Sequence, residues 1–157
     1  MKAKSGFTLV EILIVVVILG ILAAIVIPQF TEASTEAKTS RLCTDLQSVR
    51  SQIELYKIQH NDNLPGTAGA VTFVQSMIGY TLQDGSLAPV QAPGAGVFGP
   101  YMQVLPTNPF IPVADNANVV TEAAAGSAPG DDSSGWFFNT VTGVFQANDN
   151  EAGHTSL

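Results

Sequence analysis

The sequence predicts an α+β protein in which one long N-terminal helix packs on a small C-terminal head that holds a short antiparallel β-sheet. Three observations support this class. An apolar run with a single charge is long enough to be a membrane-spanning helix. A stripe of apolar side chains at helical spacing follows it. Closer to the C-terminus, two short aromatic and β-branched runs flank a turn, as in a β-hairpin. With 157 residues, the chain suits one domain with an appendage.

The apolar run covers residues 7–27, and Glu11 is its only charged residue. As a helix, these 21 residues would be about 31 Å long, enough to cross a hydrocarbon core of about 30 Å. Lys2 and Lys4 precede the run. The positive-inside rule therefore places the N-terminus in the cytoplasm and the rest of the chain across the membrane.

Two simpler interpretations of this run fit less well. A secretory signal peptide has an apolar region of about 7–15 residues and ends in an A-x-A-like site. Here the run is longer, and the Leu-Ala-Ala of residues 22–24 matches that site poorly. A plain signal anchor fits the length and orientation. It does not explain Glu11, since a carboxylate at the centre of a membrane helix costs roughly 2.5–3.5 kcal/mol.

The helix is expected to continue over residues 28–60 as an amphipathic segment. Pro28 lacks an N–H, so we expect it to kink or locally melt the helix. Beyond it, apolar residues recur in steps of four and three along one stripe. The stripe consists of Leu42, Leu46, Val49, Ile53 and Tyr56. It predicts packing against the C-terminal head. A coiled-coil partner is the alternative, although the stripe is shorter than three heptads.

The head, residues 61–157, is expected to combine loops with a hairpin at about residues 136–147. There, Trp-Phe-Phe-Asn and Val-Phe-Gln-Ala flank a turn that contains Gly143. One face of this hairpin should cover the apolar stripe of the helix. Residues 88–100 and 114–135 are rich in small residues, Pro and Gly, and are expected to be surface loops. A short helix is predicted over residues 71–80, with its buried side formed by Phe73, Val74, Met77 and Ile78.

Charge and residue types exclude several function classes. Acidic residues outnumber basic ones 13 to 6, and every Lys and Arg lies at or before Lys57. The head therefore has no lysine or arginine for phosphates, which excludes nucleic-acid binding by counterion release there. The single Cys43 excludes an intrachain disulfide and is expected to be a small helix residue. His60 and His154 fit no catalytic triad or zinc spacing, so we expect no enzymatic activity.

Residues 4–11, Lys-Ser-Gly-Phe-Thr-Leu-Val-Glu, closely resemble the processing motif of type IV pilins and type II secretion pseudopilins. Pro28 matches a proline that these proteins carry near the end of the apolar segment. The resemblance covers about 30 residues. It implies a type IV pilin-like fold and a structural filament subunit.

The resemblance also implies how the N-terminus is processed. In this superfamily a membrane peptidase cuts after the glycine, and the new N-terminal phenylalanine is N-methylated. By position, residues 1–6 are the cleaved cationic leader ending at Gly6, Phe7 is the methylated terminus, and Glu11 is the glutamate four positions inside. The new amine and the Glu11 carboxylate are one helical turn apart. Glu11 could fold back on its own Phe7 amine, or pair with that of a neighbouring subunit as an assembly device.

Within the superfamily, three short segments resemble G-type major pseudopilins: residues 105–110 (Leu-Pro-Thr-Asn-Pro-Phe), the Gly-Trp of 135–136 and the Thr-Gly of 142–143. This implies a subunit of a type II secretion pseudopilus. Such a subunit is inserted in the inner membrane with its head in the periplasm, polymerises with itself, and helps drive proteins across the outer membrane. Implied partners are the prepilin peptidase and methylase, the inner-membrane assembly platform and minor pseudopilins.

Two alternatives remain open at this point. The first is a type IV pilus subunit for adhesion, motility or DNA uptake. Many type IV pilins close their C-terminal region with a disulfide, and the single cysteine of this chain therefore favours pseudopilins. The second alternative is a membrane-anchored periplasmic enzyme or binding protein.

G-type heads commonly bind calcium in a C-terminal loop, through acidic and backbone oxygens. Two acidic segments offer such oxygens here, and neither has a complete ligand spacing. The weak calcium candidates are Asp131, Asp132, Asp149 and Glu151. The alternative is a pair of solvated acidic loops.

Overall fold

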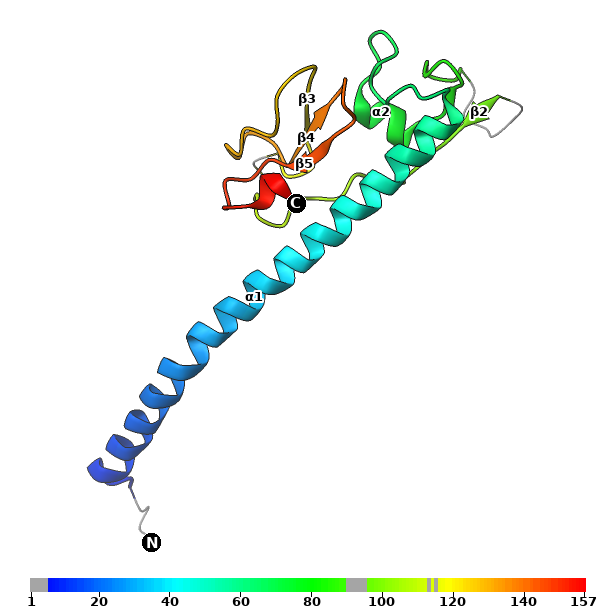
Figure 1. The fold of residues 1–157 in the computed structure, drawn as a ribbon. Coiled ribbons are helices and arrows are strands. Elements are labelled where there is room, and N and C mark those ends of the chain that lie inside the picture. The colour runs from blue at the N-terminus through cyan, green and yellow to red at the C-terminus, as the bar shows by residue number, and fades with distance from the viewer. Residues whose placement is uncertain (1–5, 90–95, 113, 115) are drawn as a thin grey trace, which may run out of the picture. The chain divides into compact units, whose positions relative to one another are not determined.

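The computed structural model describes residues 6–89, 96–112, 114 and 116–157 (Figure 1). Leader residues Lys2 and Lys4 lie outside the described residues. The chain divides into two compact units, Met1–Lys38 and Thr39–Leu157. The long helix α1, Leu9–Gln59, contributes to both units. The division falls inside the 28–60 segment of the sequence analysis, because the later part of α1 supplies core residues to the second unit.

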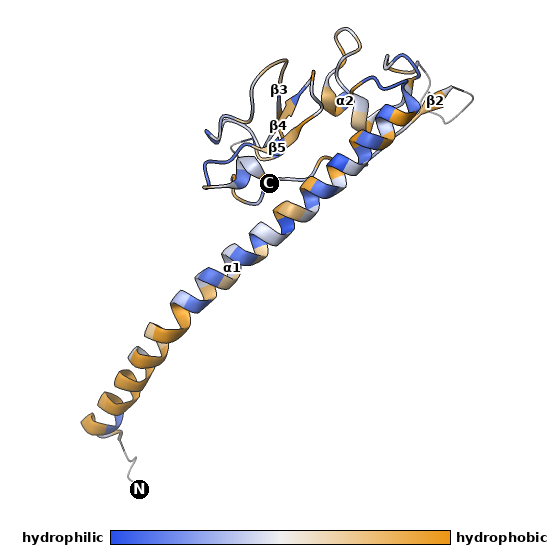
Figure 2. Cartoon of the chain, in the orientation of Figure 1, coloured by the Kyte–Doolittle hydropathy of each residue, from blue (hydrophilic) through white to orange (hydrophobic). Residues whose placement is uncertain are grey.

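In the first unit, α1 leaves its apolar side chains unpacked. Every large apolar side chain from Phe7 to Phe30 is 50–85% exposed. Figure 2 shows this part of the helix as almost continuously hydrophobic. Among the described helices, α1 alone is long and apolar enough to cross a membrane. A surface this apolar requires lipid or other protein to cover it.

Pro28 lies inside α1 without ending it. The chain is helical on both sides of the proline, and Thr31 Oγ1 donates to the Ile27 carbonyl at 3.2 Å. The predicted local melting at Pro28 is therefore wrong. Pro28 still removes the N–H that would bond to the Ala24 carbonyl. The kink at this position stays a prediction.

In the second unit, α1 buries one side. Its buried residues are those of the predicted stripe: Leu42, Leu46, Val49, Ile53 and Tyr56. After Gln59 the backbone turns, since Asn61 and Asp62 adopt left-handed conformations with φ of 53° and 64°. The Asp62 N–H donates to the Lys57 carbonyl at 2.9 Å and closes the helix end. Asparagine and aspartate tolerate this conformation better than most residues, which is why the helix ends there.

The main sheet has three strands in the order β3-β4-β5. Strands β4, Trp136–Asn139, and β5, Phe145–Ala147, pair antiparallel as the predicted hairpin, with Phe138 opposite Phe145. Strand β3, Val120–Ala123, pairs parallel to β4. This strand lies in the stretch expected to be a surface loop, so that part of the prediction is wrong. A second, two-stranded sheet pairs β1, Thr81–Leu82, with β2, Val97–Phe98. Strand β2 lies in the other expected surface loop, residues 88–100, so the prediction is wrong there too.

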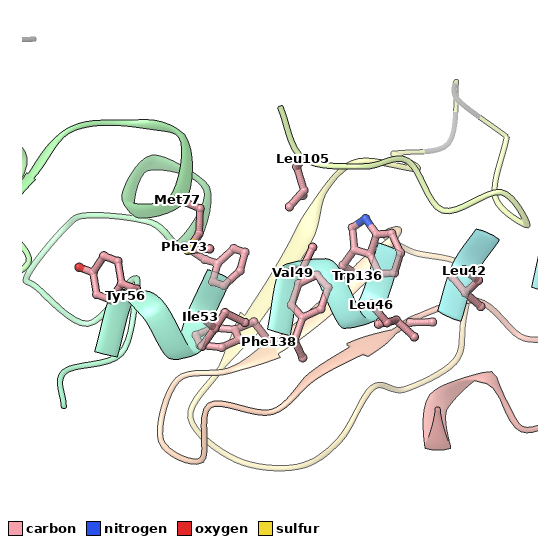
Figure 3. Packing of buried hydrophobic residues seen from close by; sticks show 12 residues of the cluster. Leu42, Leu46, Val49, Ile53, Tyr56, Phe73, Met77, Leu105, Trp136 and Phe138 are labelled. Atoms are coloured by element: carbon pink, nitrogen blue, oxygen red, sulfur yellow. The ribbon is translucent and has the colours of Figure 1, made fainter. Parts of the chain in front are cut away.

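The core of the head lies between α1 and the hairpin (Figure 3). Trp136 and Phe138 are on one face of β4, and Phe145 is on the same face of β5; all three are buried against the helix stripe. The Trp136 indole stacks on Phe145, with ring centroids 5.3 Å apart, and its Nε1 donates to the Pro106 carbonyl at 2.8 Å. The predicted covering of the stripe by the hairpin is confirmed, and with it the α+β class.

Helix α2, Phe73–Ile78, is shorter than the predicted 71–80 helix. Thr72 and Gln75 form a capping box at its start, which satisfies two free N–H groups. The helix buries Phe73, Ser76 and Met77. Ile78 was predicted on the buried side, and it is 41% exposed. The head ends with a short 3₁₀ helix, η2, His154–Ser156.

Candidate functional site

The predicted cleavage point lies in non-helical chain. Gly6, Phe7 and Thr8 precede α1, which begins at Leu9. Phe7 is 85% exposed, and no described atom lies within 4 Å of where a side chain at Gly6 would begin. Backbone groups inside a helix are occupied by hydrogen bonds, whereas those of an extended segment are available to a peptidase. The Gly6–Phe7 bond is therefore accessible in this structure.

Glu11 forms a reciprocal cap with Thr8. One carboxylate oxygen, Oε2, accepts from the Thr8 N–H at 2.7 Å and from Thr8 Oγ1 at 2.8 Å. In return, Thr8 Oγ1 accepts from the Glu11 N–H at 3.2 Å. This is a capping box, in which two side chains satisfy N–H groups that have no partner within the helix. A carboxylate in the first turn also interacts favourably with the helix dipole.

The capping role of Thr8 was not part of the sequence prediction. Its signal was present as Thr-x-x-Glu directly before an apolar run, the pattern of a capping box. Cleavage between Gly6 and Phe7 would leave the Thr8 N–H and hydroxyl in the chain, so the cap can persist after processing. Phe7 lies before this cap. The carboxylate that was expected to meet a Phe7 amine is already held by Thr8 within one chain.

The structure brings the two acidic segments of the head together. Asn148 bridges them, because its Nδ2 lies 3.2 Å from Asp131 Oδ1. The Asn150 N–H donates to Asp132 Oδ1 at 2.9 Å. The sequence alone gave no indication that these two segments meet.

The four calcium candidates do not form a metal site in this arrangement. Among the described residues, no group of three His, Cys, Asp or Glu side chains is placed to share an ion. Asp149 is buried, and both of its oxygens accept from protein donors. Hydrogen bonds from the Ser133 hydroxyl and backbone N–H hold the pKa of Asp131 below its usual range. Glu151 is exposed. The residues present do not fit the ion.

Comparison with known proteins places the chain in a family. Residues 1–27 match the family described as the prokaryotic N-terminal methylation motif. The type II secretion system core protein G of Klebsiella pneumoniae is 30% identical over 112 residues, which are 70% of this chain and 71% of that protein. The chain belongs to the type II secretion system core protein G family. These are type IV pilin-like major pseudopilins, as the resemblance implied.

Other relatives match over shorter stretches. The type II secretion system core protein G of Pseudomonas aeruginosa is 42% identical over 59 residues, and the chain spans 42% of that protein's length. A fimbrial protein of Pseudomonas aeruginosa is 36% identical over 89 residues, 55% of this chain and 56% of that protein. No solved structure gave a significant match.

Proposed function

We propose that this protein is the structural subunit of a type II secretion pseudopilus. The observation that carries the proposal is the N-terminal segment: an accessible Gly6–Phe7 bond stands directly before a capped helix, and every large apolar side chain of that helix up to Phe30 is at least half exposed. A soluble enzyme would gain nothing from such a surface. A subunit that passes from lipid to a filament uses it in both states, since neighbouring subunits can replace the lipid.

Processing converts the precursor to the assembling form. A prepilin peptidase cleaves between Gly6 and Phe7, removes Lys2 and Lys4, and leaves a free amine that the methylase modifies. Before cleavage the cationic leader holds the N-terminus in the cytoplasm, with the head in the periplasm. After cleavage the segment has one positive charge at Phe7 and one negative charge at Glu11. Extraction of the helix from the membrane then no longer requires two charged lysine side chains to enter the hydrocarbon core.

Glu11 then serves assembly between subunits. Within one chain its Oε2 is occupied by Thr8, and Thr8 is the only described residue that bonds to this carboxylate. A carboxylate can accept up to about four hydrogen bonds, so the cap and an intermolecular partner are compatible. The Phe7 amine of an adjacent subunit supplies that partner where lipid is excluded. Pairing also sets the axial register of the filament, because a displaced subunit would leave both charges unpaired.

The assembled filament has further partners. These are other copies of the chain, the inner-membrane assembly platform and minor pseudopilins. A filament that grows in the periplasm would help move folded proteins through an outer-membrane channel. The match to fimbrial proteins supports a second candidate, a type IV pilus subunit. Deletion of the gene separates the two: loss of secreted proteins with intact surface motility supports the pseudopilus, and the reverse supports a pilus.

The test of processing uses a matched pair of glycine substitutions. Gly6→Leu should leave the leader attached, because the peptidase requires a residue without a side chain at the junction. Gly20→Ala is the control, since this glycine lies inside α1 with no described atom within 4 Å of its Cβ position. Mass spectrometry of the wild type and the control should find methylated Phe7 as the first residue. Finding Met1 or Lys2 on the assembled wild-type chain would contradict the proposal.

A further inference from the structure

The head contains an oxygen cluster that is filled by an amide group. The Asn148 side chain is buried between residues 130–135 and the end of β5. Its Nδ2 lies 3.0 Å from Ser134 Oγ, 3.2 Å from Asp131 Oδ1 and 3.3 Å from Ser133 Oγ. These oxygens come from three residues of one loop and converge on a single nitrogen. The position that a cation would need is taken by an N–H donor.

The orientation of this amide is determined by a fourth contact. The Gly130 N–H donates to Asn148 Oδ1 at 2.9 Å. A backbone N–H can only donate, so the oxygen of the amide must face Gly130 and the NH₂ group must face the oxygen cluster. Backbone bonds hold the same two segments together: Asp132 N donates to the Asn148 carbonyl, and Asn148 N to the Gly135 carbonyl, both at 3.2 Å.

Asp149 is a second acidic group whose oxygens bond to donors of the protein itself. This carboxylate is 1% exposed. Its Oδ1 accepts from His154 Nδ1 at 2.6 Å, and its Oδ2 accepts from Asn108 Nδ2 at 2.7 Å. Asn108 also donates to the Gly135 carbonyl at 3.0 Å. The Phe110 ring covers the histidine, with ring centroids 4.4 Å apart.

The head supplies hydrogen-bond donors to Asp149 without a lysine or an arginine. No lysine or arginine occurs in residues 61–157, and His154 is the only histidine there. A buried carboxylate without a cation or several donors is costly. Asp149 obtains several donors from protein groups, through His154 and Asn108.

We propose that this protein fastens its C-terminal loops with its own donors in place of calcium. The Asn148 amide occupies the centre of the first cluster, and His154 with Asn108 saturates Asp149 in the second. Calcium requires about 6–8 oxygen ligands at 2.3–2.6 Å and cannot share a centre with N–H groups that point into it. The head therefore folds to the same stability with or without calcium. This inference does not depend on which filament the protein forms.

The test follows thermal unfolding of the full chain in detergent. Trp136 is the only tryptophan and is buried in the head core, so its fluorescence reports the unfolding of the head. We expect the same Tm in excess EGTA and in CaCl2 at a few millimolar, above the Kd of typical extracellular calcium sites. A ligand that binds only the folded state raises Tm, so calcium binding to the head would be seen as a higher Tm. A rise of several degrees on adding calcium would overturn the proposal.

A matched pair of variants tests the amide directly. Asn148→Asp keeps the shape of the side chain but replaces its NH₂ donor with a carboxylate oxygen. This oxygen would face the oxygens of Asp131, Ser133 and Ser134 without a hydrogen bond, so the Tm in EGTA should fall. Asn150→Asp is the control: it makes the same change two residues away, at an exposed side chain, and should leave Tm unchanged. In CaCl2 a metal centre would respond in the opposite direction, since an added carboxylate strengthens a calcium site. A Tm for Asn148→Asp that is unchanged in EGTA, or that rises above the wild-type Tm in CaCl2, therefore contradicts the proposal. If this variant does not fold, the calcium titration of the wild type decides alone.

Discussion

Glu11 has two roles that mutation can separate: it caps its own helix, and it carries a charge for a neighbouring subunit. Glu11→Gln keeps the capping box, because glutamine serves at this position as well as glutamate does. The same change removes the charge. Thr8→Val does the reverse, since it removes the hydroxyl that bonds to Glu11 Oε2 at 2.8 Å and leaves the carboxylate in place.

The expected magnitudes differ between the two variants. A hydrogen bond to a charged group contributes about 1.5–3 kcal/mol, so loss of the Phe7 amine partner should weaken subunit incorporation by roughly 10- to 150-fold. Loss of an N-cap costs about 0.5–2 kcal/mol of helix stability, and this cost falls on the first turn alone. Glu11→Gln should therefore insert and be cleaved normally but fail to assemble, whereas Thr8→Val should assemble.

The assay is competition inside one cell. Each variant is co-expressed with wild type at equal levels, filaments are sheared off, and mass spectrometry gives the ratio of the two chains in the filament and in the membrane. We expect Glu11→Gln to be depleted in filaments only. Incorporation of Glu11→Gln at parity with wild type would refute the assembly role. Glu11 would then be a recognition element for the peptidase or methylase.

Two further predictions concern the head. Trp136→Ala should lower the free energy of unfolding by about 3–5 kcal/mol, because it empties a fully buried site between the hairpin and α1. Thermal unfolding of the full chain in detergent, followed by circular dichroism, measures this loss. An unchanged Tm would show that the indole is not packed there. Burial lowers the pKa of His60, whose Nδ1–H donates to the Tyr56 carbonyl at 2.8 Å while Nε2 accepts from Thr81 Oγ1 at 2.9 Å. Stability from this neutral ring is complete above the unfolded pKa of about 6.5 and is lost as pH falls through the lowered folded pKa, by at most about 1.4 kcal/mol per pH unit. Between pH 7 and 5 the wild type should therefore lose more stability than His60→Gln, and equal slopes would contradict this account.

The N-terminal motif can be found in the sequence because its signals are local. Gly6, Phe7 and Glu11 lie within one motif of eight residues, 4–11, and the Thr8 cap follows the four-residue pattern of a capping box. The same holds for the apolar stripe and the hairpin, whose periodicities of 3.6 and 2 residues can be counted along the chain. Burial of Leu42 to Tyr56 and pairing of β4 with β5 followed as expected.

The sequence by itself determined the membrane-length helix, its amphipathic continuation, the hairpin and the processing motif, since each depends on neighbours within a few residues. Only the tertiary structure decided which remote segments meet. Strand β3 is a strand because it lies parallel to β4, and its four residues carry little signal of their own. Likewise, Asp131 bonds to Asn148 and Asp149 bonds to His154, because folding places an amide and an imidazole among the oxygens. Contacts between segments more than ten residues apart depend on the packing of the whole head, and no local pattern encodes them.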